Sequence, residues 1–171
     1  LPNIDVTSIL AEDAVTEKHK DIPFRFAYAH QVNYNLLNSG TWINTKHGRL
    51  WRLRVKSANA HSLNVTFNKY KLIDGAKLFI YNDDKTYFIG SFTSKNNKQN
   101  EQLGSTPIPG DDIIIELYEP NNSTKSSMLE IKAIAHDYKG VFNKVFKDYG
   151  SSGSCNINTV CSQGNGWEDQ I

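Results

Sequence analysis

Short runs in which apolar and polar residues alternate are the feature that most restricts the fold of this chain. In residues 50–56, Trp51, Leu53 and Val55 share one face of an extended strand, and the basic residues between and after them share the other. In a helix the same charges would be scattered around the surface. The run therefore predicts a strand with one face in an apolar core.

Similar runs recur along the chain and are separated by segments rich in Asn, Asp, Gly and Pro, which are typical of turns. We expect about eight short strands. Because no long helical pattern lies between them, parallel βαβ units are disfavoured. The prediction is an all-β fold, an antiparallel two-sheet sandwich with jelly-roll connections. The clearest strand segments are 24–28, 50–56, 63–67, 76–81, 86–93, 112–119 and 128–138.

Two of these segments carry a more specific expectation. In the first, Phe24, Phe26 and Tyr28 alternate with Arg25 and Ala27, which predicts a half-buried strand whose aromatic face points inward. The segment 112–119 is so rich in apolar residues that we expect it to be buried on both faces.

The chain divides into four parts by its residue pattern. Residues 1–22 are polar and mixed, which predicts a tail or a short helix, and residues 23–138 form the sandwich. Residues 139–149 are a connector whose apolar stripe suits a short helix able to dock on the sandwich. Gly150–Ser154 is small and polar, typical of an exposed boundary, and residues 150–171 are an extended C-terminal part. The stripe consists of Val141, Phe142, Val145 and Phe146.

Charge and hydropathy exclude several classes of partner. Lysine and arginine total 19 against 18 acidic residues, so no basic surplus attracts nucleic acid or an anionic membrane surface. No apolar run reaches the roughly 18 residues of a membrane-spanning helix. The first residues lack the pattern of a signal peptide, so in a secreted protein the signal has already been removed.

The titratable residues give weak signals for chemistry. The five histidines are isolated in sequence, so neither a metal nor a cofactor is expected. His136-Asp137 fits a fragment of a Ser-His-Asp triad, but no serine motif accompanies it, and solvation of a strand end explains the pair better. Asp83-Asp84 and Asp111-Asp112 suit calcium, yet turn chemistry explains both pairs. We therefore expect no catalytic residue in this chain.

Aromatic residues offer one candidate binding surface. A sugar-binding face on a β-sandwich needs rings whose faces remain open, whereas a core buries them. The alternation in 50–56 places Trp51 in the core, and the sequence leaves Trp42 and Tyr70 undecided. The candidates are Trp42, Trp51, Tyr70, Tyr81 and Tyr87.

The most specific signal lies in residues 150–167, Gly-Ser-Ser-Gly-Ser-Cys-Asn-Ile-Asn-Thr-Val-Cys-Ser-Gln-Gly-Asn-Gly-Trp. This segment resembles the start of the mature enzyme in the bacterial lysyl endopeptidase group of trypsin-like serine proteases, including the spacing of the two cysteines. Residues 75–82 and 90–97 look like the pro-region of related secreted proteases. The resemblance implies a secreted zymogen fragment, with a pro-domain over residues 1–149, a mature start at Gly150, and the catalytic residues beyond Ile171.

The resemblance also implies roles for individual residues. In the family, cysteines equivalent to Cys155 and Cys161 pair with cysteines in the catalytic domain. A direct bridge between the two remains open if their Cα atoms lie within roughly 4.4–6.8 Å. Tyr149, rather than a lysine, precedes Gly150, while Lys147 stands two places further back. Processing therefore follows Lys147 with later trimming, or depends on another protease, or belongs to a relative that is not specific for lysine.

Three functions are compatible with these observations. The leading hypothesis is a propeptide that assists folding of its cognate protease catalytic domain and inhibits it. The alternative is a secreted jelly-roll module that binds carbohydrate or a cell surface and precedes a protease domain. A spacer domain without regulatory effect ranks third, because the boundary sequence is so similar to that of a protease.

Overall fold

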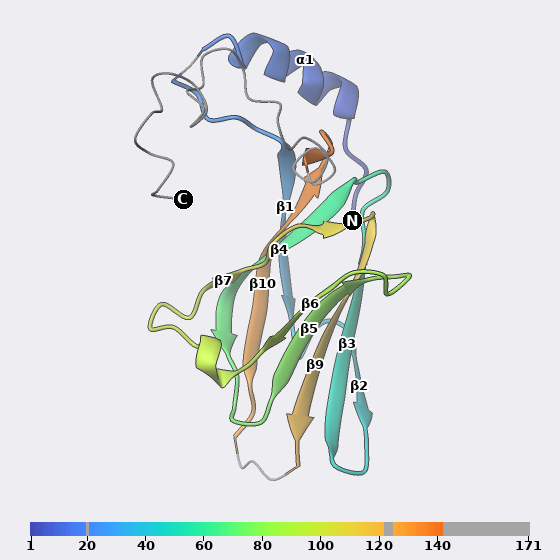
Figure 1. The fold of residues 1–171 in the computed structure, drawn as a ribbon, viewed down its shortest axis with the longest axis vertical. Coiled ribbons are helices and arrows are strands. Elements are labelled where there is room, and N and C mark those ends of the chain that lie inside the picture. Colours follow the sequence, from blue (N-terminus) through green and yellow to red (C-terminus); the bar gives the residue numbers. More distant parts are fainter. Residues whose placement is uncertain (20, 122–124, 142–171) are drawn as a thin grey trace, which may run out of the picture.

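The computed structural model describes residues 1–19, 21–121 and 125–141, which form two antiparallel sheets packed face to face with a helix across one end (Figure 1). Val141 is the last of them. The remaining residues of the predicted connector helix therefore lie outside the described residues, as do the processing residues Lys147, Tyr149 and Gly150 and the cysteines Cys155 and Cys161.

Each sheet has five strands, and every pairing is antiparallel. In the first sheet, sheet A, the order is β1-β10-β4-β7, and β8 also pairs with β4. In sheet B the order is β2-β3-β9-β5-β6. The strands of sheet A are β1 (Ala27–Asn35), β4 (Ser62–Lys71), β7 (Leu103–Gly104), β8 (Ile108–Pro109) and β10 (Met128–Asp137). Those of sheet B are β2 (Thr41–Asn44), β3 (Gly48–Lys56), β5 (Lys77–Asn82), β6 (Phe88–Phe92) and β9 (Asp112–Pro120).

The connections are those of a jelly roll. Within sheet B the chain passes directly from β2 to β3 and from β5 to β6, and β7 and β8 follow one another in sheet A. Every other connection crosses from one sheet to the other, so that β1-β10-β4-β7 faces β3-β9-β5-β6. This arrangement is the double Greek key of jelly-roll sandwiches. The predicted fold class is therefore confirmed.

The alternation in β3 places side chains as the sequence predicted. Trp51 and Val55 are buried and Leu53 packs against the core, while Arg52, Arg54 and Lys56 are exposed on the outer face. Strand β9 differs in part from its prediction. Its inward residues Ile113, Ile115 and Leu117 are fully buried, but most of its outward residues are only half-buried, because none of the described residues forms a third layer over that face of sheet B.

Trp51 is the largest fully buried side chain of the core between the sheets. Its indole nitrogen donates to the carbonyl oxygen of Ser39 at 2.8 Å. Gly40 lies against the ring with φ of +72°, and a Cβ atom there would stand 2.7 Å from the indole and 2.5 Å from the carbonyl oxygen of Arg52. Only glycine fits both that backbone conformation and that space. The turn before β2 is therefore shaped around the tryptophan.

The prediction for residues 24–28 was wrong at its start, because β1 begins at Ala27. Phe24 is exposed, and Tyr28 is exposed although it lies opposite His136 and contacts the His30 ring edge-on. The alternation correctly predicts which of these side chains share a face of the chain. The aromatic residues of the segment, however, lie at and beyond the end of the β1–β10 pairing, where core packing no longer covers them.

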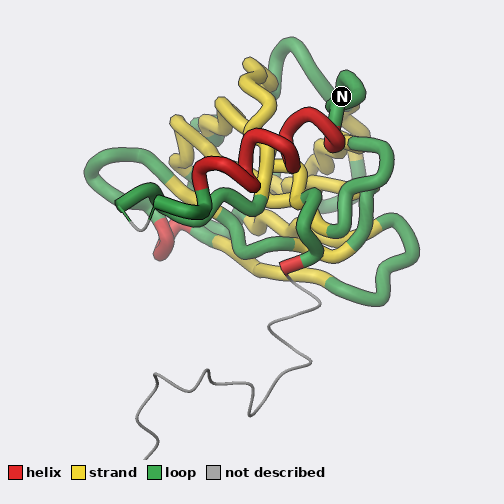
Figure 2. The backbone as a smooth tube through the Cα atoms, turned by 90° about the horizontal axis from the view of Figure 1, so that it is seen from above, coloured by secondary structure: helices red, strands yellow, loops and turns green. Residues whose placement is uncertain are grey.

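Helix α1 (Val6–Thr16) resolves the two alternatives for the first 22 residues in favour of a helix. Asp5 caps it by accepting a hydrogen bond from the Ser8 backbone N–H at 3.1 Å. Seen from above, α1 lies across the ends of the strands (Figure 2). None of the helices among the described residues has the length and apolar character needed to cross a membrane.

Candidate functional site

The outer face of sheet B carries a cluster of aromatic and charged side chains, here called the Tyr81 surface. Phe79 and Tyr81 stand two residues apart on β5 and therefore point to the same side. The ladder places Glu116 of β9 opposite Phe79, Arg52 opposite Glu116, and Phe88 opposite Tyr81. With Lys85 these residues line an open depression of ≈ 380 Å³.

Charge pairing fixes the polar centre of the Tyr81 surface. The Glu116 carboxylate accepts from Arg52 Nε at 2.5 Å and from the Tyr81 hydroxyl at 2.9 Å. Burial and the hydrogen bond to Glu116 raise the pKa of Tyr81, so the phenol remains a donor at neutral pH. Phe88 beside it is 65% exposed. The surface therefore combines open ring area with fixed polar groups, as binding sites do.

The aromatic residues expected to bind sugar separate into two groups. Trp51 and Tyr70 are buried, so neither offers an open ring, and Tyr87 is half-buried and packs against the core. Trp42 is half-buried, and the Arg49 guanidinium lies 4.2 Å from its ring centroid. Of the five candidates, Tyr81 alone belongs to the Tyr81 surface. Phe79 and Phe88 were missed, although strict alternation along 76–81 would have placed Phe79 beside Tyr81.

His136 and Asp137 do not form part of an accessible catalytic triad. His136 Nδ1 lies 2.8 Å from the Ser57 hydroxyl, a serine that the sequence did not single out, but both side chains are buried. Asp137 accepts from the Ser62 hydroxyl and from the backbone N–H groups of Lys139 and Gly140. The carboxylate thus shapes the turn after β10, and no substrate can reach the serine.

The two aspartate pairs are occupied by protein groups. Asp112 accepts a bidentate pair of hydrogen bonds from Arg54, whose guanidinium also lies 3.0 Å from Asp83. Asp84 accepts from both the backbone and the hydroxyl of Thr86. The Arg54 guanidinium therefore already engages carboxylate oxygens that a calcium ion would need as ligands. Within residues 1–19, 21–121 and 125–141, no group of three or more His, Cys, Asp or Glu side chains is placed to hold a metal.

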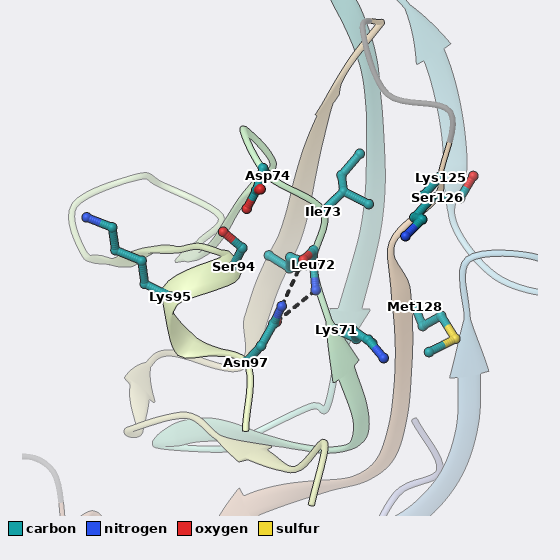
Figure 3. A pocket seen from close by; sticks show the side chains of 10 residues that line it. All are labelled: Lys71, Leu72, Ile73, Asp74, Ser94, Lys95, Asn97, Lys125, Ser126 and Met128. Atoms are coloured by element: carbon teal, nitrogen blue, oxygen red, sulfur yellow. Dashed lines mark hydrogen bonds between the residues drawn. The ribbon is translucent and has the colours of Figure 1, made fainter. Parts of the chain in front are cut away.

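The turn between β4 and β5, which lies at the end of the sandwich opposite α1 (Figure 1), lines a hollow of ≈ 890 Å³ (Figure 3). Asn97 ties its two walls together by exchanging hydrogen bonds with the backbone of Leu72, both at 2.9 Å. In Figure 3, Lys95 and Lys125 lie on opposite sides of the hollow. The described residues that line it include no aromatic ring, so the Tyr81 surface is the better candidate for stacking against a ligand.

Comparison with known proteins found no family model that matches the chain. Two solved structures share limited similarity. One is an exo-β-1,3-galactanase from Phanerochaete chrysosporium with β-1,3-galactotriose, at 8% identity and a TM-score of 0.31 over 66% of this chain and 30% of the galactanase. The other is a family 35 carbohydrate-binding module from an environmental isolate, at 16% identity and a TM-score of 0.25 over 67% of this chain and 87% of the module. At these scores the jelly-roll assignment rests on the strand order alone.

Proposed function

We propose that the sandwich is a non-catalytic binding module within the precursor of a secreted trypsin-like serine protease. The observation that carries this proposal is the segment 150–167, whose sequence resembles the mature start of lysyl endopeptidase-like enzymes. The fold is consistent with it, because the last strand of the described residues ends at Asp137, 13 positions before Gly150. The buried Ser57–His136 pair argues against catalysis by the module itself.

The partner we favour is the protease domain itself, so that the module acts as a pro-domain. A short connector between two parts of one chain gives an effective concentration of about millimolar, so even a weak contact is populated before cleavage. A module that binds the native protease preferentially also stabilises it. Assistance in folding and inhibition therefore follow from one interaction.

Two experiments test the pro-domain role. Sequencing the coding region beyond Ile171 is expected to reveal catalytic His, Asp and Ser residues in a trypsin-like domain, and their absence would refute the proposal. A chain ending at Tyr149 is then added to the mature enzyme during refolding and during assay. Inhibition or an increased yield of active enzyme is expected, and failure of both would leave the module without a pro-domain role.

Carbohydrate binding is the second candidate function, and the Tyr81 surface favours it. The exposed Phe88 ring, beside a fixed carboxylate and guanidinium, offers stacking and hydrogen bonding at the same place. The surface is open and faces away from the core, so a long polymer has access to it.

A glycan array followed by affinity electrophoresis with soluble polysaccharides tests this second function. If the Tyr81 surface binds sugar, Phe88→Ala is expected to weaken binding by about fivefold to tenfold. Tyr28→Ala, which removes an exposed ring from sheet A, serves as the matched control and is expected to leave binding unchanged. Absence of any glycan ligand, or equal losses in both variants, would exclude carbohydrate binding at this surface.

A further inference from the structure

Helix α1 is attached to the sandwich by charge and leaves apolar side chains uncovered. Asp13 is the only one of its residues that is fully buried. Five of the large exposed apolar or aromatic side chains fall within residues 10–28, and Leu10 is 44% exposed. An isolated helix of this length is marginally stable in water and normally depends on packing of an apolar face. The helix therefore lacks a partner among the described residues for part of its surface.

The chain leaves the sandwich beside one particular flank of α1. Lys139 Nζ lies 2.7 Å from Asp13 and also pairs with Glu17, the residue at the C-terminal end of the helix. Leu10 and Ala14 precede Glu17 by seven and three positions, so all three share one flank. The chain thus reaches α1 on its Leu10 flank, at the end marked by Glu17.

Phe24 extends this apolar flank on the other side of Lys139. Its ring centroid lies 4.6 Å from Lys139 Nζ, and the side chain is 60% exposed. Arg25 next to it bonds to Asp13 and to the Ile9 carbonyl oxygen, which holds this segment alongside the helix. We call Leu10, Ala14 and Phe24 the exit patch.

We propose that the exit patch is the docking site for the connector that follows it, through the apolar residues Phe142, Val145 and Phe146. These residues begin three positions after Lys139. Leu10 and Glu17 are separated by about 10 Å along the helix axis, and an extended connector covers that distance within about three residues. Docking at this site requires no rearrangement of the sandwich.

Charge complementarity supports the same occupant. Between Asp5 and Glu17, all charged side chains of the helix and its two caps are acidic, and these four carboxylates exceed the two basic side chains, Arg25 and Lys139, that pair with three of them. The connector carries Lys144 and Lys147 between and after its apolar residues. Docking would place basic side chains near an acidic helix and would shield the peptide bonds after both lysines. The consequence is a connector whose cleavage depends on its release from α1.

Limited trypsin digestion of the 171-residue chain, followed by mass spectrometry, measures the rate of cleavage after Lys144 and Lys147. Leu10→Ser is expected to accelerate these cleavages by about tenfold, because proteolysis follows the population of the released state. Val15→Ser is the matched control, since Val15 is 61% exposed but lies about 140° around the helix from Leu10. Equal rates in the wild type and Leu10→Ser, or equal acceleration by both variants, would overturn the proposal.

A second variant separates docking from simple unfolding of α1. The double variant Phe142→Ser and Phe146→Ser leaves every residue of the sandwich and the helix unchanged. Amide hydrogen exchange over residues 6–16 is expected to accelerate by about tenfold when the connector can no longer dock. Unchanged exchange in this variant would overturn the proposal whatever the digestion shows. Neither result depends on whether the chain belongs to a protease precursor.

Discussion

The sandwich and helix α1 are parts of one structure held together by different forces. In the sandwich, apolar side chains from both sheets, such as Trp51, Phe67 and Ile115, are fully buried between the layers. At α1 the group that is buried is a carboxylate, Asp13, held by Arg25, Tyr138 and Lys139. Salt acts mainly on the second type of contact, whereas loss of apolar volume acts on the first.

The difference shows where regulation can act without unfolding the protein. Apolar burial is cooperative, so a change in the core affects the whole sandwich. An attachment through a few charges opens locally, at a free energy well below that of global unfolding. Helix α1 also lies where the chain leaves toward residue 150, so local opening there changes access to the connector and leaves the sandwich folded.

The largest effect is expected from a change in the core. Trp51→Ala removes the largest buried side chain and should lower the free energy of unfolding by about 3–5 kcal/mol. Urea titration followed by circular dichroism measures the loss. Leu37→Ala is the control, because Leu37 is 98% exposed and its replacement should change stability by less than about 0.5 kcal/mol. A Trp51→Ala variant of unchanged stability would refute the assignment of the core.

A smaller and local effect is expected at α1. Asp13→Asn removes the charge that Arg25 and Lys139 share, so amide exchange over residues 6–16 should accelerate on the order of tenfold or more. The midpoint of global unfolding should change much less than it does in Trp51→Ala. Glu12→Gln removes an exposed partner of the same arginine and should have little effect. If Asp13→Asn and Trp51→Ala lowered global stability equally, the distinction between the two regions would fail.

Residue patterns predict the sandwich well because the alternation that buries its apolar side chains is visible within short segments of the sequence. The alternation around Trp51 predicted its burial, and the spacing of strands and turns predicted the antiparallel two-sheet sandwich. The attachment of α1 was not predictable, because Asp13 and Tyr138 are 125 positions apart and neither belongs to a motif. The prediction for residues 24–28 failed for a related reason. Their alternation is real, but only the complete fold determines where core packing ends.

The candidate site was predictable only in part. Tyr81 was recognised as an aromatic of interest, but its association with Arg52 and Glu116 depends on strand order, which brings β3, β9 and β5 together. The buried Ser57–His136 pair likewise joins positions 79 residues apart. The segment 150–167 provides the opposite case. Its resemblance to a protease start is an expectation from the sequence alone, and the segment lies outside the described residues.

Mild acid is expected to affect the sandwich before α1. Burial lowers the pKa of His30, with a contribution from the Leu1 amino group, and burial also lowers the pKa of His136, together with the nearby His30. The rings lie 6.3 Å apart, and neither Nε2 atom has a hydrogen-bond partner within the described structure. Histidine in the unfolded chain takes up protons below its ordinary pKa of about 6.5, so stability should fall as the pH drops below that value.

His30→Leu tests this expectation. It removes one of the two buried imidazoles and should make the loss of stability between pH 7 and pH 5 shallower, as measured by urea midpoints. His47→Leu, which alters an exposed histidine, is the control, and an equally shallow pH dependence in that variant would contradict the role of the buried pair. An identical pH dependence in His30→Leu and the wild type would show that the buried pair does not titrate in this range.

Helix α1 should resist the same acid. Burial raises the pKa of Asp13, but hydrogen bonds from Lys139, Tyr138 and Arg25 outweigh it and lower the pKa to about 2. The ordinary value is 3.8, so the stabilisation by this carboxylate is present above pH 4 and is lost as the pH falls from about 4 to about 2. Amide exchange over residues 6–16, corrected for intrinsic rates, should therefore change little between pH 7 and pH 5.

Salt should produce the smallest effect. Unlike mild acid, it should affect α1 more than the sandwich. At 1 M NaCl the Debye length falls to about 3 Å, so the exposed pairs of Lys139 with Glu17 and of Arg25 with Glu12 are screened. Exchange over residues 6–16 should accelerate by about twofold to threefold, because each such pair contributes less than about 1 kcal/mol. The urea midpoint of the sandwich should stay constant or rise, since burial of apolar surface does not depend on charge. Equal sensitivity of both regions to salt would mean that packing, rather than charge, attaches α1 to the sandwich. The contacts of Asp13 would then be a consequence of where the helix lies and not the cause of it.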